Sequence, residues 1–265
     1  MSRSRINLNV QAMAVSDAIA ALERKTRVRT RNVPEVAEAP EPVKGKAKGA
    51  KASAAARPES SGSGEIRIVG GQWRRTRLPV AQRPGLRPTP DRVRETLFNW
   101  LGQDLTGWRC MDAFAGTGVL GFEAASRGAR EVSMVEIDAA LVAQLRKLQE
   151  RLAASMVKIQ RGDALSALQQ VNAGSLDLVL LDPPFSEDAL FLPALRAACS
   201  AVGADGWIYL EAPAEWDDAA LAPLGLVRQR HLKAGAVHAH LLRKAAAAAA
   251  PDAHSPLPQE NLPHG

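Results

Sequence analysis

A glycine-rich turn between a short apolar run and a helical stretch constrains this chain more than any other feature. Residues 108–111 read as a buried strand and residues 120–126 as a helix, so Gly116 and Gly118 fall in the turn between them. Glycine adopts positive φ angles and lets a ligand come close to the backbone. The free N–H groups at the start of the helix then face that ligand. The pattern predicts a strand–turn–helix unit of an α/β protein with a nucleotide-type cofactor at the turn.

The glycines alone leave two kinds of cofactor open. Gly116-Thr-Gly-Val-Leu-Gly121 also fits the G-x-G-x-x-G dinucleotide fingerprint, which is weak on its own, and Glu136 lies at a suitable distance for ribose hydroxyls. Asp112, however, stands just before the glycines, where a carboxylate would repel a pyrophosphate. The same carboxylate suits the cationic amino acid end of S-adenosylmethionine. The sequence therefore favours S-adenosylmethionine, and a dinucleotide oxidoreductase stays a minor alternative.

Acidic residues follow the next two predicted strands. Strand 132–136 ends in Glu136, whose carboxylate can accept charge-assisted hydrogen bonds from both ribose hydroxyls. Asp163 follows strand 157–160 and can accept a hydrogen bond from the adenine amino group. Each acid could instead serve as a helix cap or a first-turn residue. The candidate cofactor residues share positions at the carboxyl ends of strands, and they are Asp112, Phe114, Gly116, Thr117, Gly118, Glu136 and Asp163.

A second motif, Asp182-Pro-Pro-Phe185, follows the apolar run 176–181, which reads as a buried strand. Ligands of open parallel sheets bind beyond such strand ends. Two prolines have fixed φ and no N–H, so the turn is expected to be stiff, with its carbonyls outward and unpaired. If Asp182 and the Pro183 carbonyl accept the hydrogens of an exocyclic base amine, its lone pair can attack a sulfonium methyl while Phe185 stacks on the base. The candidate catalytic residues are Asp182, Pro183, Pro184 and Phe185.

These motifs, with two more, resemble the RsmD family over roughly residues 62–243, in uninterrupted order. The additional segments are Ser61-Gly-Ser-Gly-Glu-Ile-Arg-Ile-Val-Gly-Gly-Gln-Trp-Arg74 and Leu86-Arg-Pro-Thr-Pro-Asp-Arg-Val-Arg-Glu-Thr-Leu-Phe-Asn-Trp-Leu101, which are specific to that family. Its members are bacterial enzymes that methylate the N2 of one guanine in 16S ribosomal RNA, using S-adenosylmethionine. The resemblance implies that Asp112, Gly116, Gly118 and Glu136 hold the cofactor and that residues 182–185 form the catalytic clamp.

The expected fold is α/β: a class I S-adenosylmethionine-dependent methyltransferase (Rossmann-like) fold. Its sheet should have seven mostly parallel strands with one antiparallel strand, because alternating runs at 226–231 and 237–242 should pair as a terminal hairpin. A small N-terminal β-hairpin and helix module should precede it. Strands at 66–69 and 77–80 flank a glycine turn, and Thr89 should cap a helix with Pro90 in its first turn.

Positive charge is concentrated in the segment before the cofactor turn. Residues 65–100 hold 8 Lys and Arg against 3 acids, whereas residues 101–265 hold 14 against 19. The alternative to a nucleic-acid surface is a solvated basic face, but Trp73 among the arginines favours contact with RNA phosphates. The candidate RNA-binding residues are Arg67, Arg74, Arg75, Arg77, Arg87, Arg92 and Arg94, with Arg83 beside them.

Four regions are expected along the chain. Residues 1–61 form a basic Ala/Pro/Lys-rich tail that cannot bury enough apolar surface to fold and should be disordered. It is either a tail specific to this protein, the product of a start placed too far upstream or, less simply, a transit peptide. Residues 62–101 form the module that covers the active site and holds RNA, residues 102–244 the methyltransferase domain, and residues 245–265 a second disordered tail.

Composition fits a cytoplasmic, monomeric enzyme. A chain of 265 residues that is 46% hydrophobic can bury one α/β core, and no apolar run is long enough to span a bilayer. Cys110 and Cys199 lack metal-ligand spacing and are expected to be packing residues in a reducing compartment. His238 and His240 share one face of a strand, but no third ligand is near them. We therefore expect no metal.

The predicted function is methyl transfer to guanine N2 in 16S ribosomal RNA, within the small ribosomal subunit or its assembly intermediate, with S-adenosylhomocysteine as the second product. An adenine-N6 methyltransferase acting on DNA or RNA is one alternative, because the clamp treats exocyclic amines alike. A non-catalytic assembly factor that binds ribosomal RNA is another, although Asp112, Glu136 and Asp182 would serve no purpose in a pure binder.

Overall fold

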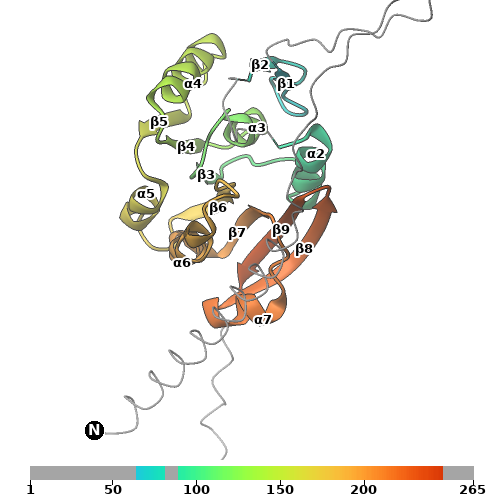
Figure 1. Cartoon of the computed structure of the whole chain (residues 1–265). Helices are drawn as coiled ribbons and strands as arrows, with labels where there is room; N and C mark the ends of the chain where they lie inside the picture. Colours follow the sequence, from blue (N-terminus) through green and yellow to red (C-terminus); the bar gives the residue numbers. More distant parts are fainter. Residues whose placement is uncertain (1–63, 81–88, 247–265) are drawn as a thin grey trace, which may run out of the picture.

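The computed structural model describes residues 64–80 and 89–246 of the chain. The predicted N-terminal tail, most of the predicted C-terminal tail, Arg83 and Arg87 lie outside the described residues. The arrangement of the described elements is shown in Figure 1.

A seven-stranded sheet forms the centre of the protein, with the strands in the order β5-β4-β3-β6-β7-β9-β8. The pairs between β3, β4, β5, β6 and β7 are parallel, and β9 runs antiparallel to both β7 and β8. One strand is thus antiparallel to the rest, which confirms the predicted fold. The strands are β3 (Arg109–Asp112), β4 (Glu131–Glu136), β5 (Val157–Arg161), β6 (Leu176–Leu181), β7 (Val202–Ala212), β8 (Leu226–Ala234) and β9 (Val237–Lys244).

Helices cover both faces of the sheet, so the domain has three layers (Figure 1). Alternate strand residues point to opposite faces. One apolar core lies between the sheet and α2, α3 and α4, and it includes Cys110, Leu178 and Tyr209. The other lies between the sheet and α5, α6 and α7 and includes Met111 and Val179. The helices are α2 (Asp91–Trp100), α3 (Val119–Ser126), α4 (Ala139–Arg151), α5 (Ala164–Gln170), α6 (Phe191–Ala201) and α7 (Asp218–Leu221), with short 3-10 turns at η1 (Asp188–Leu190) and η2 (Ala222–Leu224).

The segment before the cofactor turn forms a small antiparallel ribbon of β1 (Glu65–Arg67) and β2 (Arg77–Pro79), in which Ile66 pairs with Leu78. Both of these side chains are buried in the core that contains α2 and α3. The ribbon and α2 therefore pack against the helix that follows the glycine turn.

The start of α2 differs from the sequence prediction. Pro90 is the N-cap residue, and no side chain caps the helix. Thr89 is buried instead, with its hydroxyl turned inward, so it does not cap the helix as predicted. The apolar stripe of the helix is formed by Val93, Leu97 and, just past its end, Leu101, which are all buried.

Within the described ranges, every helix is too short or too polar to traverse a lipid bilayer.

Candidate active site

Three carboxylates follow neighbouring strands at one edge of the sheet. Asp112 is the last residue of β3. Asp182 directly follows Leu181 of β6, and Glu211 directly follows Leu210 of β7, which is paired with Leu181. Strand alternation directs all three toward the face that carries Cys110, Leu180 and Tyr209, which is the face covered by α2 and α3. The sequence prediction that Asp112 and Asp182 occupy one edge is therefore consistent with the topology.

Asp112 is held in a nearly closed environment and is only 1% exposed. Its Oδ2 accepts a hydrogen bond of 2.9 Å from the N–H of Gly121, but its buried Oδ1 has no partner among the described residues. Burial raises the pKa of this carboxyl to about 7, opposed by the Gly121 hydrogen bond and supported by the charges of Glu136 and Glu211. A buried oxygen without a partner is costly, so a cationic donor from a ligand would fit here.

The two glycines of the turn have different roles. Both have positive φ, 51° at Gly116 and 78° at Gly118. A Cβ on Gly118 would also meet the side-chain ends of Leu145 of α4 and Met134 of β4, so both the positive φ and the local packing favour glycine there. Gly116 remains the position where the turn can face a cofactor.

Glu136 is fixed by two backbone donors. Its Oε2 accepts a hydrogen bond from the N–H of Gly116 and its Oε1 one from the N–H of Asp138, both 2.8 Å long. The carboxylate is thus oriented beside the glycine turn, with lone pairs left over for hydroxyl groups. Of the other candidates, Thr117 is buried, and Phe114 is partly buried against the core on the α5 and α6 side.

Asp163 acts as the N-cap of α5. Its Oδ1 accepts a 2.8 Å hydrogen bond from the N–H of Ser166, and this bond is the main reason why the pKa of the carboxyl is lowered. The capping alternative is therefore observed, while the contact with adenine stays a prediction.

The Pro-Pro turn differs in one respect from its predicted form. Pro183 is buried and Pro184 exposed, but the Pro184 carbonyl accepts a 3.0 Å hydrogen bond from Glu187, so it is not unpaired. The carbonyl that remains for a base amine is the one predicted, that of Pro183. Phe185 packs against the core shared with α6 and keeps part of its ring exposed.

Glu211 is a site residue that the sequence analysis missed. It is 2% exposed, and it accepts a 2.9 Å hydrogen bond from the Tyr209 hydroxyl. Burial raises the pKa of Glu211. The pKa of Asp182 also lies well above its usual range, because of burial first and then because of the negative charges of Glu211 and Asp112. The sequence carries only a partial signal, because Glu211 directly follows the apolar run 207–210. The register of β6 with β7 is what places it beside Asp182.

Arg94 was predicted to contact RNA, and this prediction is wrong. Its side chain is fully buried, pairs with Glu123 of α3, and bonds to Asp91 at 2.6 Å and the Thr89 carbonyl at 3.1 Å. Its charge also lowers the pKa of Glu211. Its long-range partner on α3, Glu123, draws it inward, and helical spacing alone could not reveal that partner. Five of the predicted arginines are exposed, namely Arg67, Arg74, Arg75, Arg77 and Arg92.

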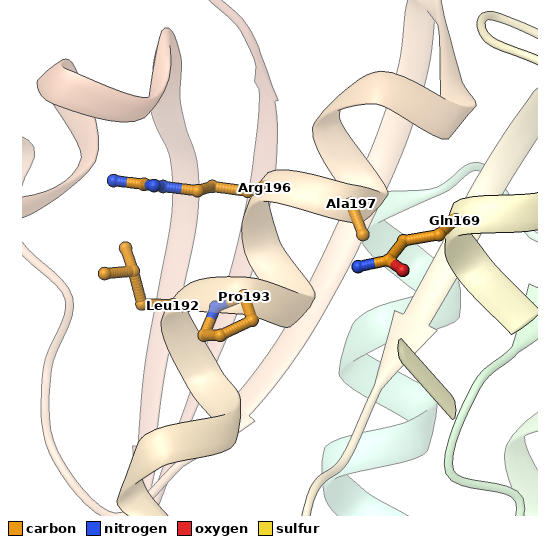
Figure 2. A pocket seen from close by; sticks show the side chains of 5 residues that line it. All are labelled: Gln169, Leu192, Pro193, Arg196 and Ala197. Carbon is orange, nitrogen blue, oxygen red and sulfur yellow. The ribbon is translucent and has the colours of Figure 1, made fainter. Parts of the chain in front are cut away.

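Two hollows on the described surface lie elsewhere. One, of about 360 Å³, is lined by Gln169 of α5 and by four residues of α6, and Figure 2 shows their side chains around it. Another lies at the amino ends of the strands, beside Trp108 and Asp177. Neither is lined by a predicted cofactor or catalytic residue, so the candidate site is defined by its chemistry and its place at the sheet edge.

The sequence matches a family model described as conserved hypothetical protein 95 over residues 66–243. Among curated proteins, it is 48% identical over 133 residues to the ribosomal RNA small subunit methyltransferase D of Escherichia coli, a match that spans 50% of this chain and 67% of that protein. The protein of the same name from Haemophilus influenzae is 46% identical over 125 residues, which is 46% of this chain and 65% of the relative.

Solved structures give the same result for the fold. A putative methyltransferase from Escherichia coli superposes with a TM-score of 0.60 at 39% identity, covering 69% of this chain and all (100%) of that one. A putative methylase from Haemophilus influenzae gives a TM-score of 0.57 at 33% identity, covering 69% of this chain and 99% of the other.

Proposed function

Because this chain belongs to the RsmD family, whose model spans most of the described residues, we propose that it methylates ribosomal RNA of the small subunit with S-adenosylmethionine as the methyl donor. The finer proposal is transfer to the exocyclic N2 of one guanine in 16S ribosomal RNA. The observation that carries it is the placement of Asp182-Pro-Pro-Phe185 beyond β6, beside the glycine turn that follows β3.

The residues at the glycine turn fit S-adenosylmethionine. The buried Oδ1 of Asp112 without a partner suits the ammonium group of the methionine part, and the oriented Glu136 carboxylate suits two ribose hydroxyls. Phe114, Gly116 and Thr117 complete the turn around it, and Asp163 would contact the adenine amino group. Bound S-adenosylmethionine supplies an electrophilic methyl group on a positively charged sulfur.

The clamp residues would orient the base. The Asp182 carboxylate and the Pro183 carbonyl would accept the two amine hydrogens and direct the nitrogen lone pair at the methyl group, while Phe185 holds the ring. A base that enters this site has to leave its stack. The ionised form of Asp182 is the stronger acceptor, and its pKa is raised by burial and by two nearby acids, so it would also take up a proton readily after transfer.

Exposed arginines of the N-terminal segment would contact the RNA backbone. Arg67, Arg74, Arg75 and Arg77 lie on or between β1 and β2, and Arg92 lies on α2. Arg87 stays a candidate outside the described residues. Such contacts would give affinity without reading sequence. The base would then be chosen by the site itself.

Two other functions make different predictions. An adenine-N6 methyltransferase would produce methyladenosine in RNA or DNA. An assembly factor would bind the particle without transferring a methyl group, which leaves no purpose for the buried Asp112 and the partly buried Asp182. The proposed enzyme acts in the cytoplasm as a monomer on the small subunit or its assembly intermediate, and methyl transfer itself calls for no metal.

The decisive experiment is transfer of labelled methyl from S-adenosylmethionine to undermethylated small ribosomal subunits, followed by nucleoside analysis. N2-methylguanosine from the wild-type protein, and none from Asp182→Ala, is the expected result. Asp188→Ala, which changes an acid exposed just beyond the clamp, is the matched control and should keep activity. Methyladenosine would select the adenine alternative, and tight binding without transfer would select the assembly factor.

A further inference from the structure

Three histidines lie together on the terminal hairpin. His231 of β8 is opposite His240 of β9, and the next pair in register toward the turn on the same face brings Lys233 opposite His238. The ring nitrogens of the three histidines that could bind a metal all lie within 4.8 Å of one another. The sequence prediction that no third ligand is near His238 and His240 is therefore wrong. The third imidazole comes from the neighbouring strand, through a register that sequence spacing does not show.

The buried member of this cluster, His240, has both ring nitrogens in use. Its Nε2 accepts a 3.0 Å hydrogen bond from the Trp216 N–H, so the proton of the neutral ring is on Nδ1, which faces the Leu210 carbonyl at 3.3 Å. These two contacts fix the orientation of the His240 ring, which stacks on His231 with 4.8 Å between the ring centroids.

The other two histidines face each other at the distance expected for two ligands of one ion. The Nε2 of His231 and the Nδ1 of His238 are 3.1 Å apart, and both side chains are partly exposed. A Zn–N bond is about 2.0–2.1 Å long, so two nitrogens on one ion are about 2.9–3.4 Å apart for ligand angles of about 90–110°. In the metal-free protein these two nitrogens form a hydrogen bond, and with 5.2 Å between the ring centroids they point nearly at each other. Binding of an ion would therefore replace that hydrogen bond and would require the two rings to rotate.

A carboxylate stands behind one of the two ligands. The Oε1 of Glu215 is 4.0 Å from the Nδ1 of His231, on the opposite side of the ring from His238. Metal-binding histidines commonly donate their second N–H to a carboxylate, which fixes the tautomer and raises ligand basicity. Glu215 also pairs with Arg228, which holds it in place. The exposed Lys233 and the Arg228 guanidinium are nearby positive charges that oppose a cation.

We propose that His231 and His238 bind one divalent transition-metal ion, of the kind that prefers imidazole nitrogen, with Zn²⁺ as the representative. Glu215 orients His231, His240 lines the site, and water completes the coordination. The histidines lie on the sheet face that carries Leu210 and Leu242, opposite the face of Glu211. The site is therefore separate from methyl transfer, and it would join β8 to β9 as a metal cross-link.

Isothermal titration calorimetry of ZnCl₂ into the full chain tests this proposal. The protein is purified without a polyhistidine tag, stripped of metal, and titrated at about pH 7.5, where imidazoles are neutral. We expect one Zn²⁺ per wild-type chain and no such binding for His231→Asn or His238→Asn. Glu215→Gln should weaken binding about tenfold. Zn²⁺ should raise the melting temperature of the wild type but not that of either histidine variant.

The two remaining histidines of the chain provide the matched control. The double variant His254→Asn/His264→Asn should bind Zn²⁺ as the wild type does, and circular dichroism should show that every variant is folded. Equal Zn²⁺ affinity in the wild type and in His231→Asn would overturn the site. Loss of binding in the control variant, or a wild-type chain that takes up no Zn²⁺, would also overturn it. Methyl transfer by the same protein samples is measured separately, so failure here leaves the proposed function intact.

Discussion

Arg94 of α2 and Glu123 of α3 form an ion pair in which neither side chain reaches solvent. Glu123 also accepts hydrogen bonds from the backbone N–H groups of Val69 at 2.6 Å and Gly70 at 3.3 Å. Arg127 approaches the same carboxylate at 3.4 Å. One buried carboxylate therefore ties the N-terminal segment and α2 to the helix that starts at the cofactor turn.

Loss of Arg94 should destabilise the whole domain. Arg94→Met leaves Glu123 as a buried charge with weakened compensation, so we expect the free energy of unfolding to fall by about 3–5 kcal/mol. Urea denaturation measures the change. Arg92→Ala, on the exposed side of the same helix, should shift stability by no more than about 0.5 kcal/mol. Similar stability of the two variants would show that the pair is not needed.

Cofactor affinity should depend on pH through Asp112. The pKa of this carboxyl is raised to about 7, so it is neutral below that pH and cannot attract an ammonium group. The dissociation constant of S-adenosylmethionine should rise as pH falls through about 7. Calorimetry at pH values on both sides checks this. Asp112→Asn should weaken binding about ten- to a hundredfold and remove the pH dependence; a pH dependence that persists in the variant would point to another group.

Neutralising Glu211 should let the enzyme work at lower pH. The charge of Glu211 helps to raise the pKa of Asp182, so Glu211→Gln should lower that pKa and move the acid limb of the kcat/KM profile toward lower pH. The glutamine still accepts a hydrogen bond from Tyr209. Glu187→Gln, which changes an exposed acid, should leave the profile in place. An acid limb that stays fixed in Glu211→Gln would remove Glu211 from the site.

Removal of exposed arginines should weaken RNA binding in a salt-dependent way. The logarithm of the association constant falls with the logarithm of the salt concentration. In Arg74→Ala and in Arg92→Ala, the magnitude of that slope should be smaller by about 0.7–0.9 if the removed arginine contacts one phosphate. Affinity for S-adenosylmethionine should not change. Arg196→Ala, beside the hollow on α6 seen in Figure 2, is the control. Binding of small subunits over a salt series gives the slopes, and a slope equal to that of the control would exclude contact by that arginine.

The central sheet could be predicted from the sequence because its strands are short apolar runs separated by helical patterns and glycine turns. The antiparallel edge followed from the alternating runs of the terminal hairpin. What could not be predicted is how side chains from distant elements meet. Arg94 lies one residue from the apolar stripe of its helix, and only its partner on α3 draws it inward. Thr89 similarly turns into the core rather than capping α2.

The site was predictable in proportion to how local its signals are. The glycine turn and the Pro-Pro motif carry their chemistry within a few residues, so Asp112, Glu136 and Asp182 could be identified as candidates. Glu211 required the register of β6 and β7, which places it beside Asp182. Likewise, the cluster of His231 with His238 depends on the pairing of β8 with β9.

The Glu123 carboxylate also limits where the chain can be truncated without loss of folding. A shortened protein that starts at residue 102, where the sequence pattern changes, would lose Arg94 and both backbone donors at once. It would keep a carboxylate that was buried for those partners, at the base of the helix that carries the cofactor turn. The methyltransferase domain is therefore expected to be recovered in folded form only together with the segment that begins near residue 64.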